Sequence, residues 1–237
     1  MKNAIVLCSG GLDSVVTAHY VKKKLNYEYI KIVFFNYNQK SLASERACSK
    51  KCANDISAEF IEVDLKWLGN ITNSLDNKPK KVTRKELKDS SKESERLYVP
   101  CRNIVFLVYS LALAESLYIK KKEKYDLFTG FKNEGKEYYP DTTPAFIEQM
   151  NKLSRIGCYK NFKIIAPLIK KDKEEIVKIG EKLKINFKET FSCHRSIRGK
   201  HCGYCLACRL RQEGFYWADV KDPTDYKENM KDFRLAN

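Results

Sequence analysis

The segment AIVLCSGGLDSVVTAHY near the N-terminus constrains the fold of this chain more than any other feature. Residues 3–8 predict a short buried strand, and residues 13–24 have the spacing of a helix. Between them lies a turn of serines and glycines, residues 9–14. A strand that passes through such a turn into a helix is the building unit of a parallel α/β sheet, and the start of the helix binds phosphate through its backbone amides.

The turn SGGLDS differs from the two common nucleotide-binding turns. Gly10 and Gly11 are adjacent, which excludes the G-x-G-x-x-G fingerprint, and no lysine follows them, which excludes the Walker turn. The glycines let an anion approach the backbone, and Ser9 and Ser14 add hydroxyl donors. The turn therefore suits the pyrophosphate that leaves when ATP donates AMP. Asp13 can hold magnesium or brace the turn.

The rest of the chain repeats the alternation of strand and helix. Apolar and β-branched runs predict further strands at residues 29–37, 58–65, 125–130 and 162–169. Helical spacing predicts helices at residues 42–56, within TTPAFIEQMNKL (142–153) and at residues 172–183. Asp172 is the expected cap of the last of these helices. Residues 104–119 are nearly all apolar and predict a buried helix. The prediction is an α/β fold with a doubly wound, Rossmann-like parallel sheet.

Two regions depart from this alternation. Residues 76–97 carry almost no large apolar side chain and predict a mobile surface insertion or lid. Residues 190–216 have four cysteines and little periodicity, which indicates a small metal-stapled appendage. We therefore divide the chain into a nucleotide-binding domain, residues 1–189, and a zinc-binding segment with its tail, residues 190–237.

The C-terminal appendage contains four cysteines with the spacing C-x8-C-x2-C-x2-C: Cys193, Cys202, Cys205 and Cys208. Four thiolates form a closed tetrahedral zinc site, which is structural because no coordination position stays open. An iron–sulfur cluster and a set of redox thiols are the alternatives. His194 and His201 flank the cysteines and could also ligate a metal. Cys48 and Cys52 lie four residues apart in a predicted helix and are expected to pack in the core.

Charge and hydropathy narrow the range of partners. The 237 residues carry a net charge of +15, which suits polyanions, but the lysines are spread along the chain and no arginine-rich arm stands out. We expect a solvated, lysine-rich surface and no requirement for nucleic-acid contact. No apolar run reaches the ~18 residues of a membrane span, and the N-terminus does not have the pattern of a signal peptide. We therefore expect a cytoplasmic protein without membrane contact.

Six segments follow one another in the order of a known motif series: SGGLDS (9–14), NYNQK (36–40), VPCRN (99–103), YYPDTTPAF (138–146), APLIKKDKEEI (166–176) and SCHRSIRGKHCGYCLACRLRQEGF (192–215). Over nearly the whole chain they resemble the 7-cyano-7-deazaguanine synthase family, N-type ATP pyrophosphatases with an adenine nucleotide alpha hydrolase-like fold. The resemblance implies an ATP-dependent C–N ligase that converts 7-carboxy-7-deazaguanine and ammonia into the 7-nitrile, in queuosine or archaeosine biosynthesis. It further implies adenylated carboxylate and amide intermediates, the cofactors ATP, magnesium and zinc, and a homodimer.

The resemblance assigns site residues in three groups. Catalytic roles fall to Asp13, Ser14, Arg102 and Lys173. ATP binding falls to Cys8, Ser9, Gly10, Gly11, Leu12, Asp13, Ser14, Asn36 and Tyr37. Substrate binding falls to Gln39, Arg102, Asn103, Gly130 and Asp141. Simpler roles stay open for four of them: a salt bridge to a lid carboxylate for Arg102, solvation for Lys173, a cap of the next helix for Asp141 and core packing for Tyr37.

The chain departs from the family pattern near the substrate. Cys101 stands where the family usually has a small residue, often glycine. After Tyr-Pro-Asp the family commonly has Cys and Arg, where this chain has Thr142 and Thr143. After the glutamine of NYNQK the family usually has Arg-His, where this chain has Lys40 and Ser41. Because of these changes, the sequence does not fix the precise acceptor or product of the reaction. The nearest alternative is a divergent ligase that joins a deazaguanine carboxylate to another amine, on a protein or nucleic acid. An RNA-binding enzyme of the tRNA-thiolating or lysidine type and a non-catalytic nucleotide-binding module are two further alternatives.

Overall fold

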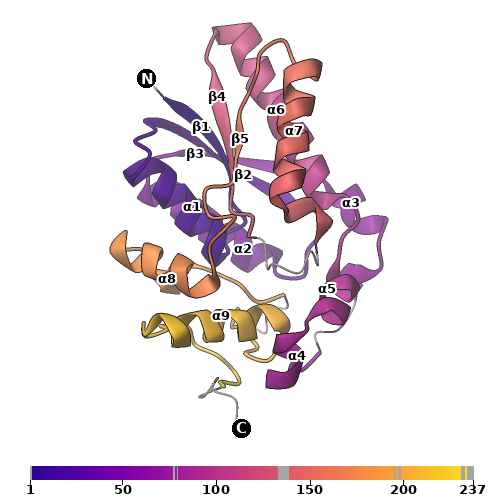
Figure 1. The fold of residues 1–237 in the computed structure, drawn as a ribbon, viewed down its shortest axis with the longest axis vertical. Coiled ribbons are helices and arrows are strands. Elements are labelled where there is room, and N and C mark those ends of the chain that lie inside the picture. Colours follow the sequence, from indigo (N-terminus) through magenta and orange to yellow (C-terminus); the bar gives the residue numbers. More distant parts are fainter. Residues whose placement is uncertain are drawn as a thin grey trace.

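A parallel sheet forms the centre of the computed structural model, which describes residues 2–76, 78, 80–132, 139–194, 196, 199–230 and 233. Within these residues the sheet has five strands in the order β3–β2–β1–β4–β5 (Figure 1). The chain runs outwards from β1 (Asn3–Leu7) through β2 (Tyr29–Asn36) and β3 (Glu59–Asp64), and then to the other side through β4 (Tyr125–Thr129) and β5 (Ile164–Ile165). This doubly wound order confirms the predicted fold class, although β5 is much shorter than predicted.

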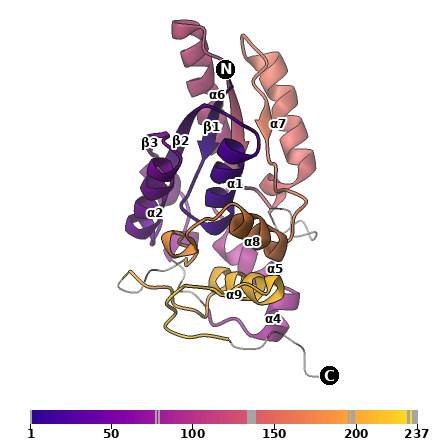
Figure 2. The same ribbon diagram turned by 90° about the vertical axis from the view of Figure 1, so that its left-hand side faces the viewer.

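Helices cover both faces of the sheet (Figures 1 and 2). On one face lie α1 (Leu12–Lys23) and α2 (Leu42–Asp55). On the other lie α6 (Arg102–Lys121) and α7 (Pro144–Gly157). Beyond the carboxyl ends of the strands, α8 and α9 pack against each other. The remaining helical elements are α3 (Lys66–Asn70), α4 (Arg84–Lys88), α5 (Ser91–Leu97), α8 (Lys173–Lys182), α9 (Leu206–Ala218) and the single turns Ser74–Asp76, Pro140–Thr142 and Phe187–Glu189.

The central strand β1 divides its side chains between two apolar layers. Ala4, Val6 and Cys8 join the layer beneath α1 and α2. Ile5 and Leu7 point to the opposite face and join the layer beneath α6 and α7. This alternation is the two-residue period of a strand that is buried on both faces, as parallel strands in α/β proteins are.

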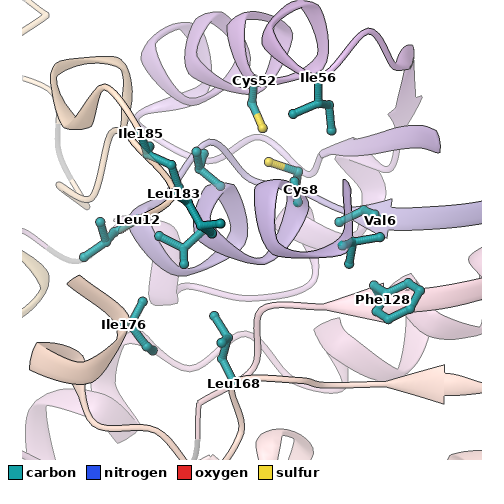
Figure 3. Close-up of a cluster of buried hydrophobic side chains, with 14 of the residues drawn as sticks. Val6, Cys8, Leu12, Cys52, Ile56, Phe128, Leu168, Ile176, Leu183 and Ile185 are labelled. Atoms are coloured by element: carbon teal, nitrogen blue, oxygen red, sulfur yellow. The ribbon is translucent and has the colours of Figure 1, made fainter. Parts of the chain in front are cut away.

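Figure 3 shows the first of these layers, in which Cys52 of α2 and Ile56, the residue after α2, face Cys8. The thiol groups of Cys8 and Cys52 point toward each other, and the hydrogen bond from Cys52 lowers the pKa of Cys8 to about 7. Cys52 is buried, as predicted. Cys48 is only partly buried because its side chain lies at the edge of the cluster that contains the four C-terminal cysteines.

The long helix α6 is buried on one side only. Leu107, Leu111 and Ala114 pack toward the sheet, whereas Ile104 and Val108 are 38% and 46% exposed. The prediction of a buried helix is therefore wrong for the outer face of α6, because apolar composition does not say how much of a helix its neighbours cover. Within the described residues, α6 is also the one helix long and apolar enough to cross a membrane by length and composition alone, a test that core helices of soluble proteins pass as well.

The segment 76–97 contains α4 and α5 and docks on the C-terminal part of the chain (Figure 1). Its buried Val82 donates a backbone hydrogen bond to Tyr204 O at 2.9 Å, and Nε of Arg209 donates to Val82 O at 3.3 Å. Residues 77 and 79 lie outside the described residues, as does Tyr138 of the segment 138–146. The role of this segment as a mobile lid stays a prediction.

Candidate active site

The loop between β1 and α1 needs a glycine at position 10 because α2 packs closely against it. Gly10 has a φ of +76°, and a Cβ atom there would lie 2.4 Å from Glu45 O, so only glycine fits. The hydroxyl of Ser14 donates to Gly11 O at 3.0 Å and lies 3.3 Å from the hydroxyl of Ser9. Two hydroxyl groups and the first amides of α1 therefore converge on one loop, where they can hold an anion.

A cavity of about 340 Å³ opens at this loop, at the carboxyl ends of β1 and β4. This is where the strand order reverses direction, the usual ligand site of a doubly wound sheet. Of the residues predicted for the site, those that line the cavity are Cys8, Ser9, Gly11, Leu12, Asp13, Ser14, Tyr37, Gln39, Arg102, Asn103, Gly130, Lys173 and Cys193. Gly10, Asn36 and Asp141 do not line it. Gly130 approaches the loop so closely that a Cβ atom there would lie 2.9 Å from Ser14 N.

Lys173, the first residue of α8, forms an ion pair with Asp13 at the loop. Its Nζ lies 2.6 and 2.8 Å from the two carboxylate oxygens. The lysine side chain reaches the loop because α9 has a glycine where it crosses: a Cβ atom on Gly214 would lie 2.2 Å from Lys173 Cγ. Lys173 is thus placed at the loop and is not merely solvated.

Arg102 begins α6 and faces the loop from across the cavity. Its Nη1 donates to the hydroxyl of Tyr37 at 3.4 Å, and its guanidinium lies 5.7 Å from the centre of the Tyr37 ring. Burial raises the pKa of Tyr37, which keeps this hydroxyl protonated. Among the described residues, no carboxylate forms a salt bridge with Arg102, so the alternative of a bridge to a lid carboxylate finds no support there. A cation at a cavity wall without an anionic partner is suited to bind an anionic ligand.

A second cavity of about 410 Å³ joins the first. Leu97, Tyr98 and Val99 form part of its wall, so the insertion and the residues that follow it contribute to the site. The residues common to both cavities are Tyr37, Gln39, Glu45, Arg102 and His194. Lys40 and Ser41, two of the departures from the family pattern, line the second cavity only.

Asp141 contacts the start of α6 rather than the cavity. One carboxylate oxygen accepts from Asn103 N at 3.3 Å, and the other is buried without a hydrogen-bond partner among the residues that the structure describes. The following helix, α7, is capped instead by Thr143, whose hydroxyl accepts from Phe146 N at 3.1 Å. The alternative that Asp141 caps the next helix is therefore wrong. Its predicted contact with the substrate stays a prediction.

The four cysteines of the C-terminal segment converge as their spacing predicts. Their sulfur atoms all lie within 4.8 Å of one another and are buried, and the sulfurs of Cys202 and Cys208 are 3.9 Å apart. Tetrahedral coordination by four thiolates at about 2.3 Å needs sulfur–sulfur distances of this size. His201 cannot serve as a ligand through Nε2, because this atom accepts from Ser192 N at 3.0 Å. The cysteine cluster could therefore bind a metal without histidine.

The segment that carries the cysteine cluster also forms a wall of the first cavity, to which Cys193 contributes. Phe191 N donates to Gly10 O at 2.8 Å, which ties the segment directly to the loop. Three further residues line this cavity: His194, expected only as a possible metal ligand, and Arg211 and Glu45, which the sequence did not indicate. Nothing in the local sequence placed Glu45 at the cavity, because acidic residues are common in the first turn of a helix. Arg211 is fully buried and donates to the hydroxyls of Thr190 and Ser192, a role that no motif indicates.

Known proteins resemble the chain over nearly its whole length. The sequence profile of the queuosine biosynthesis protein QueC matches residues 3–219. A 7-cyano-7-deazaguanine synthase from Methanobrevibacter smithii is 36% identical over 96% of this chain and 99% of its own length. A 7-cyano-7-deazaguanine synthase from Methanocaldococcus jannaschii is 35% identical over 95% of this chain and 99% of its own length. The solved structure of the U34-tRNA thiolase NcsA from Methanococcus maripaludis, at 15% identity and a TM-score of 0.48 over 92% of this chain and 64% of its own, is too distant to carry an argument. The chain therefore belongs to the family of the queuosine biosynthesis protein QueC.

Proposed function

We propose that the protein uses ATP to convert 7-carboxy-7-deazaguanine and ammonia into 7-cyano-7-deazaguanine, a step of queuosine or archaeosine biosynthesis. The names of full-length relatives at 30–36% identity support this reaction. The single observation that carries it is a cavity in which the SGGLDS loop faces Arg102, a cation without a salt bridge among the described residues. Such a cavity can place a carboxylate beside the α-phosphate of ATP.

In this proposal one end of the cavity binds the substrate carboxylate, and the other end binds the phosphates of ATP. Arg102 pairs with the substrate carboxylate and orients it toward the nucleotide. Ser9, Ser14 and the amides of α1 hold the pyrophosphate that leaves as the carboxylate is adenylated, and Lys173 adds positive charge there. Ammonia then displaces AMP to give the amide, and a second adenylation, on the amide oxygen, releases AMP again to give the nitrile.

We further propose two metals. Asp13 is the carboxylate of the loop, and it would hold magnesium if Lys173 leaves it for the phosphates of ATP. Magnesium typically binds through one carboxylate together with substrate phosphates, where it would screen charge on ATP. Zinc fits the four converging thiolates, where it would be structural and would hold the wall that contains Phe191. Metal analysis of the purified protein tests this: one zinc per chain is the expected result, and iron with visible absorbance would overturn it.

A ligase that joins the same carboxylate to a larger amine is the second candidate. The observation in its favour is that Lys40 and Ser41, which depart from the family pattern, line the second cavity beside the expected substrate. In that case AMP would be released only when a protein or nucleic acid supplies the amine.

One assay distinguishes these functions. The protein is incubated with ATP, magnesium, ammonium and 7-carboxy-7-deazaguanine, and the products are followed by mass. The expected result is AMP, pyrophosphate and the nitrile, whereas an arrested amide, or AMP only with added protein or RNA, would favour the second candidate. Ser14→Ala and Asp13→Asn should abolish AMP release, and normal turnover in these variants would contradict the loop assignment.

We also propose a homodimer that works in the cytoplasm. The exposed residues Ile104, Val108 and Tyr109 form an apolar, uncharged surface on α6, which a second copy could cover. Because each copy carries a net charge of +15, an uncharged face is where two copies repel each other least. Sedimentation velocity should give the mass of a dimer, and Val108→Glu should shift it to that of a monomer. A monomeric wild type would overturn this proposal.

A further inference from the structure

Glu45 lies where the two cavities meet. It belongs to the first turn of α2, is half-buried and lines both cavities. Among the described residues that line the two cavities, the carboxylates are Asp13 and Glu45. Asp13 is paired with Lys173, whereas Glu45 forms no salt bridge with any described residue. The carboxylate of Glu45 is therefore available to bind a positively charged or hydrogen-bond-donating ligand in this site.

The carboxylate of Glu45 is held in one orientation. Its Oε2 accepts from Nε2 of Gln39 at 3.0 Å, and its Oε1 accepts from the hydroxyl of Ser41 at 2.5 Å. Gln39 is itself anchored, since its Oε1 accepts from Tyr37 N at 3.0 Å and its Nε2 also donates to Phe35 O at 3.1 Å. Each oxygen of Glu45 keeps a lone pair free for a further donor.

The surroundings of Glu45 favour proton uptake. Burial raises the pKa of the Glu45 carboxyl, and the hydrogen bonds from Ser41 and Gln39 counteract only part of that effect. Carboxyls with a raised pKa in a cavity are suited to general-base chemistry near neutral pH. The charge of Arg102 also lowers this pKa, but no described cation forms a salt bridge with Glu45, so a small nitrogen ligand that donates hydrogen bonds would stabilise the carboxylate.

We propose that Glu45, positioned by Gln39 and Ser41, forms the ammonia site of the reaction and takes a proton from the attacking nitrogen. This inference rests on the proposed function. The adenylate joins the nucleotide at the loop to the acyl group at Arg102, so its reactive carbon lies near the junction of the cavities. Ammonia bound to Glu45 is on the cavity wall at that junction.

The step balances as follows. The nitrogen lone pair forms the C–N bond to the acyl carbon, the C–O bond to the phosphate of AMP breaks, and AMP leaves with that electron pair. One N–H proton passes to the carboxylate of Glu45, which returns it to solvent through the open cavity. Ammonia and the acyl adenylate thus become the amide, AMP and one proton.

The variant Glu45→Gln tests this role because it keeps the shape of the side chain and removes the base. Two reactions are measured with the metal-loaded protein: carboxylate-dependent exchange of labelled pyrophosphate into ATP, which needs no ammonia, and amide formation with ammonium chloride. The expected result is exchange within about threefold of wild type and amide formation reduced about 100-fold, the typical size of a general-base contribution. Glu148→Gln, at an exposed glutamate of α7 paired with Lys152, is the matched control and should change neither reaction.

Hydroxylamine provides the readout that a structural role would not affect. Its nitrogen is a stronger nucleophile and loses its proton to water more easily than that of ammonia, so hydroxamate formation by Glu45→Gln should return to within about fivefold of wild type. Amide formation near the wild-type rate, or a loss of pyrophosphate exchange equal to the loss of amide formation, would overturn the ammonia site. A wild-type protein without exchange on 7-carboxy-7-deazaguanine would overturn the proposed function and this inference with it.

Discussion

The two ends of the cavity are built in different ways. At the loop, the groups that face the cavity come from one strand–turn–helix unit, and backbone conformation places them. At the far end, Tyr37, Glu45 and Arg102 come from three segments, and their side chains do the binding. The comparison teaches that the loop should be sensitive to changes that add a Cβ atom. The far end should be sensitive to changes of functional group that leave the backbone alone.

The largest effect is expected from Gly10→Ala. A Cβ atom there would lie 2.4 Å from Glu45 O and 2.9 Å from Ser49 N, at a φ of +76° that alanine rarely adopts. We expect a loss of about 3 kcal/mol or more in the free energy of unfolding, because a buried clash adds to the cost of a left-handed conformation. AMP release should fall to background. Urea unfolding and a steady-state AMP assay check both results.

The matched control at the loop is Gly11→Ala. Gly11 has an extended conformation, and the nearest atom to its added Cβ would be Ser9 Oγ at 3.3 Å. This variant should lose less than about 1 kcal/mol of stability, since no backbone has to move. Equal losses in the two variants would show that the loop does not depend on the backbone conformation of Gly10.

Arg102→Lys tests the far end by exchanging one cation for another. Lysine keeps the charge but cannot bind a carboxylate through two parallel hydrogen bonds or stack as arginine does on Tyr37. We expect kcat/KM for the carboxylate substrate to fall about 100-fold, while the KM for ATP changes less than about threefold, because a lost bidentate contact costs about 3 kcal/mol. Steady-state kinetics with each substrate varied in turn gives both values. An increase in the KM for ATP equal to the loss for the carboxylate would place Arg102 on the nucleotide instead.

The difference between the two ends also explains what the sequence could predict. The loop is local: strand, glycines, serines and helix lie within residues 3–23, so their order already implies their geometry. The cysteine cluster was equally predictable, because three of its cysteines lie within seven residues and the spacing is typical of a metal site. The adjacency of that cluster to the loop was not accessible, because it depends on the tertiary contact of Phe191 with Gly10.

The far end was only partly predictable for the same reason. Arg102 and Tyr37 were expected because the resemblance names their motifs, but nothing local indicated that Glu45 lies opposite them. Gln39 was expected at the substrate and lines both cavities, but nothing local indicated that its hydrogen bonds also hold the turn after β2 and the carboxylate of Glu45. Which polar groups meet in a doubly wound sheet depends on how separate strand ends converge, and periodicity does not report this.

A pH prediction concerns α1, the helix that carries the loop. His19 is 5% exposed on this helix, and burial, with Lys23 nearby, lowers its pKa from 6.5 to about 4. Between pH 6.5 and 4, His19 is protonated in the unfolded chain but not in the folded chain. The free energy of unfolding therefore decreases as the pH falls through this window. Relative to His19→Gln, the wild type should lose about 1–2 kcal/mol more in the free energy of unfolding between pH 7 and 4.5. Urea unfolding at both pH values measures this, and parallel pH dependences would contradict it.

The smallest effect is expected at Cys101, which precedes Arg102 and begins the far end. Cys101 has a φ of +54°, a left-handed conformation at the N-terminus of α6. Cys101→Gly should raise the free energy of unfolding by about 0.5 kcal/mol, because relief of this conformation exceeds the added entropy of the unfolded chain. Cys101→Ala removes the thiol but keeps the conformation, so its stability should equal that of wild type in urea unfolding. An equal gain in both variants would assign the effect to the thiol. A gain in glycine alone, with kcat/KM unchanged, would show that the far end tolerates a backbone change that the loop does not.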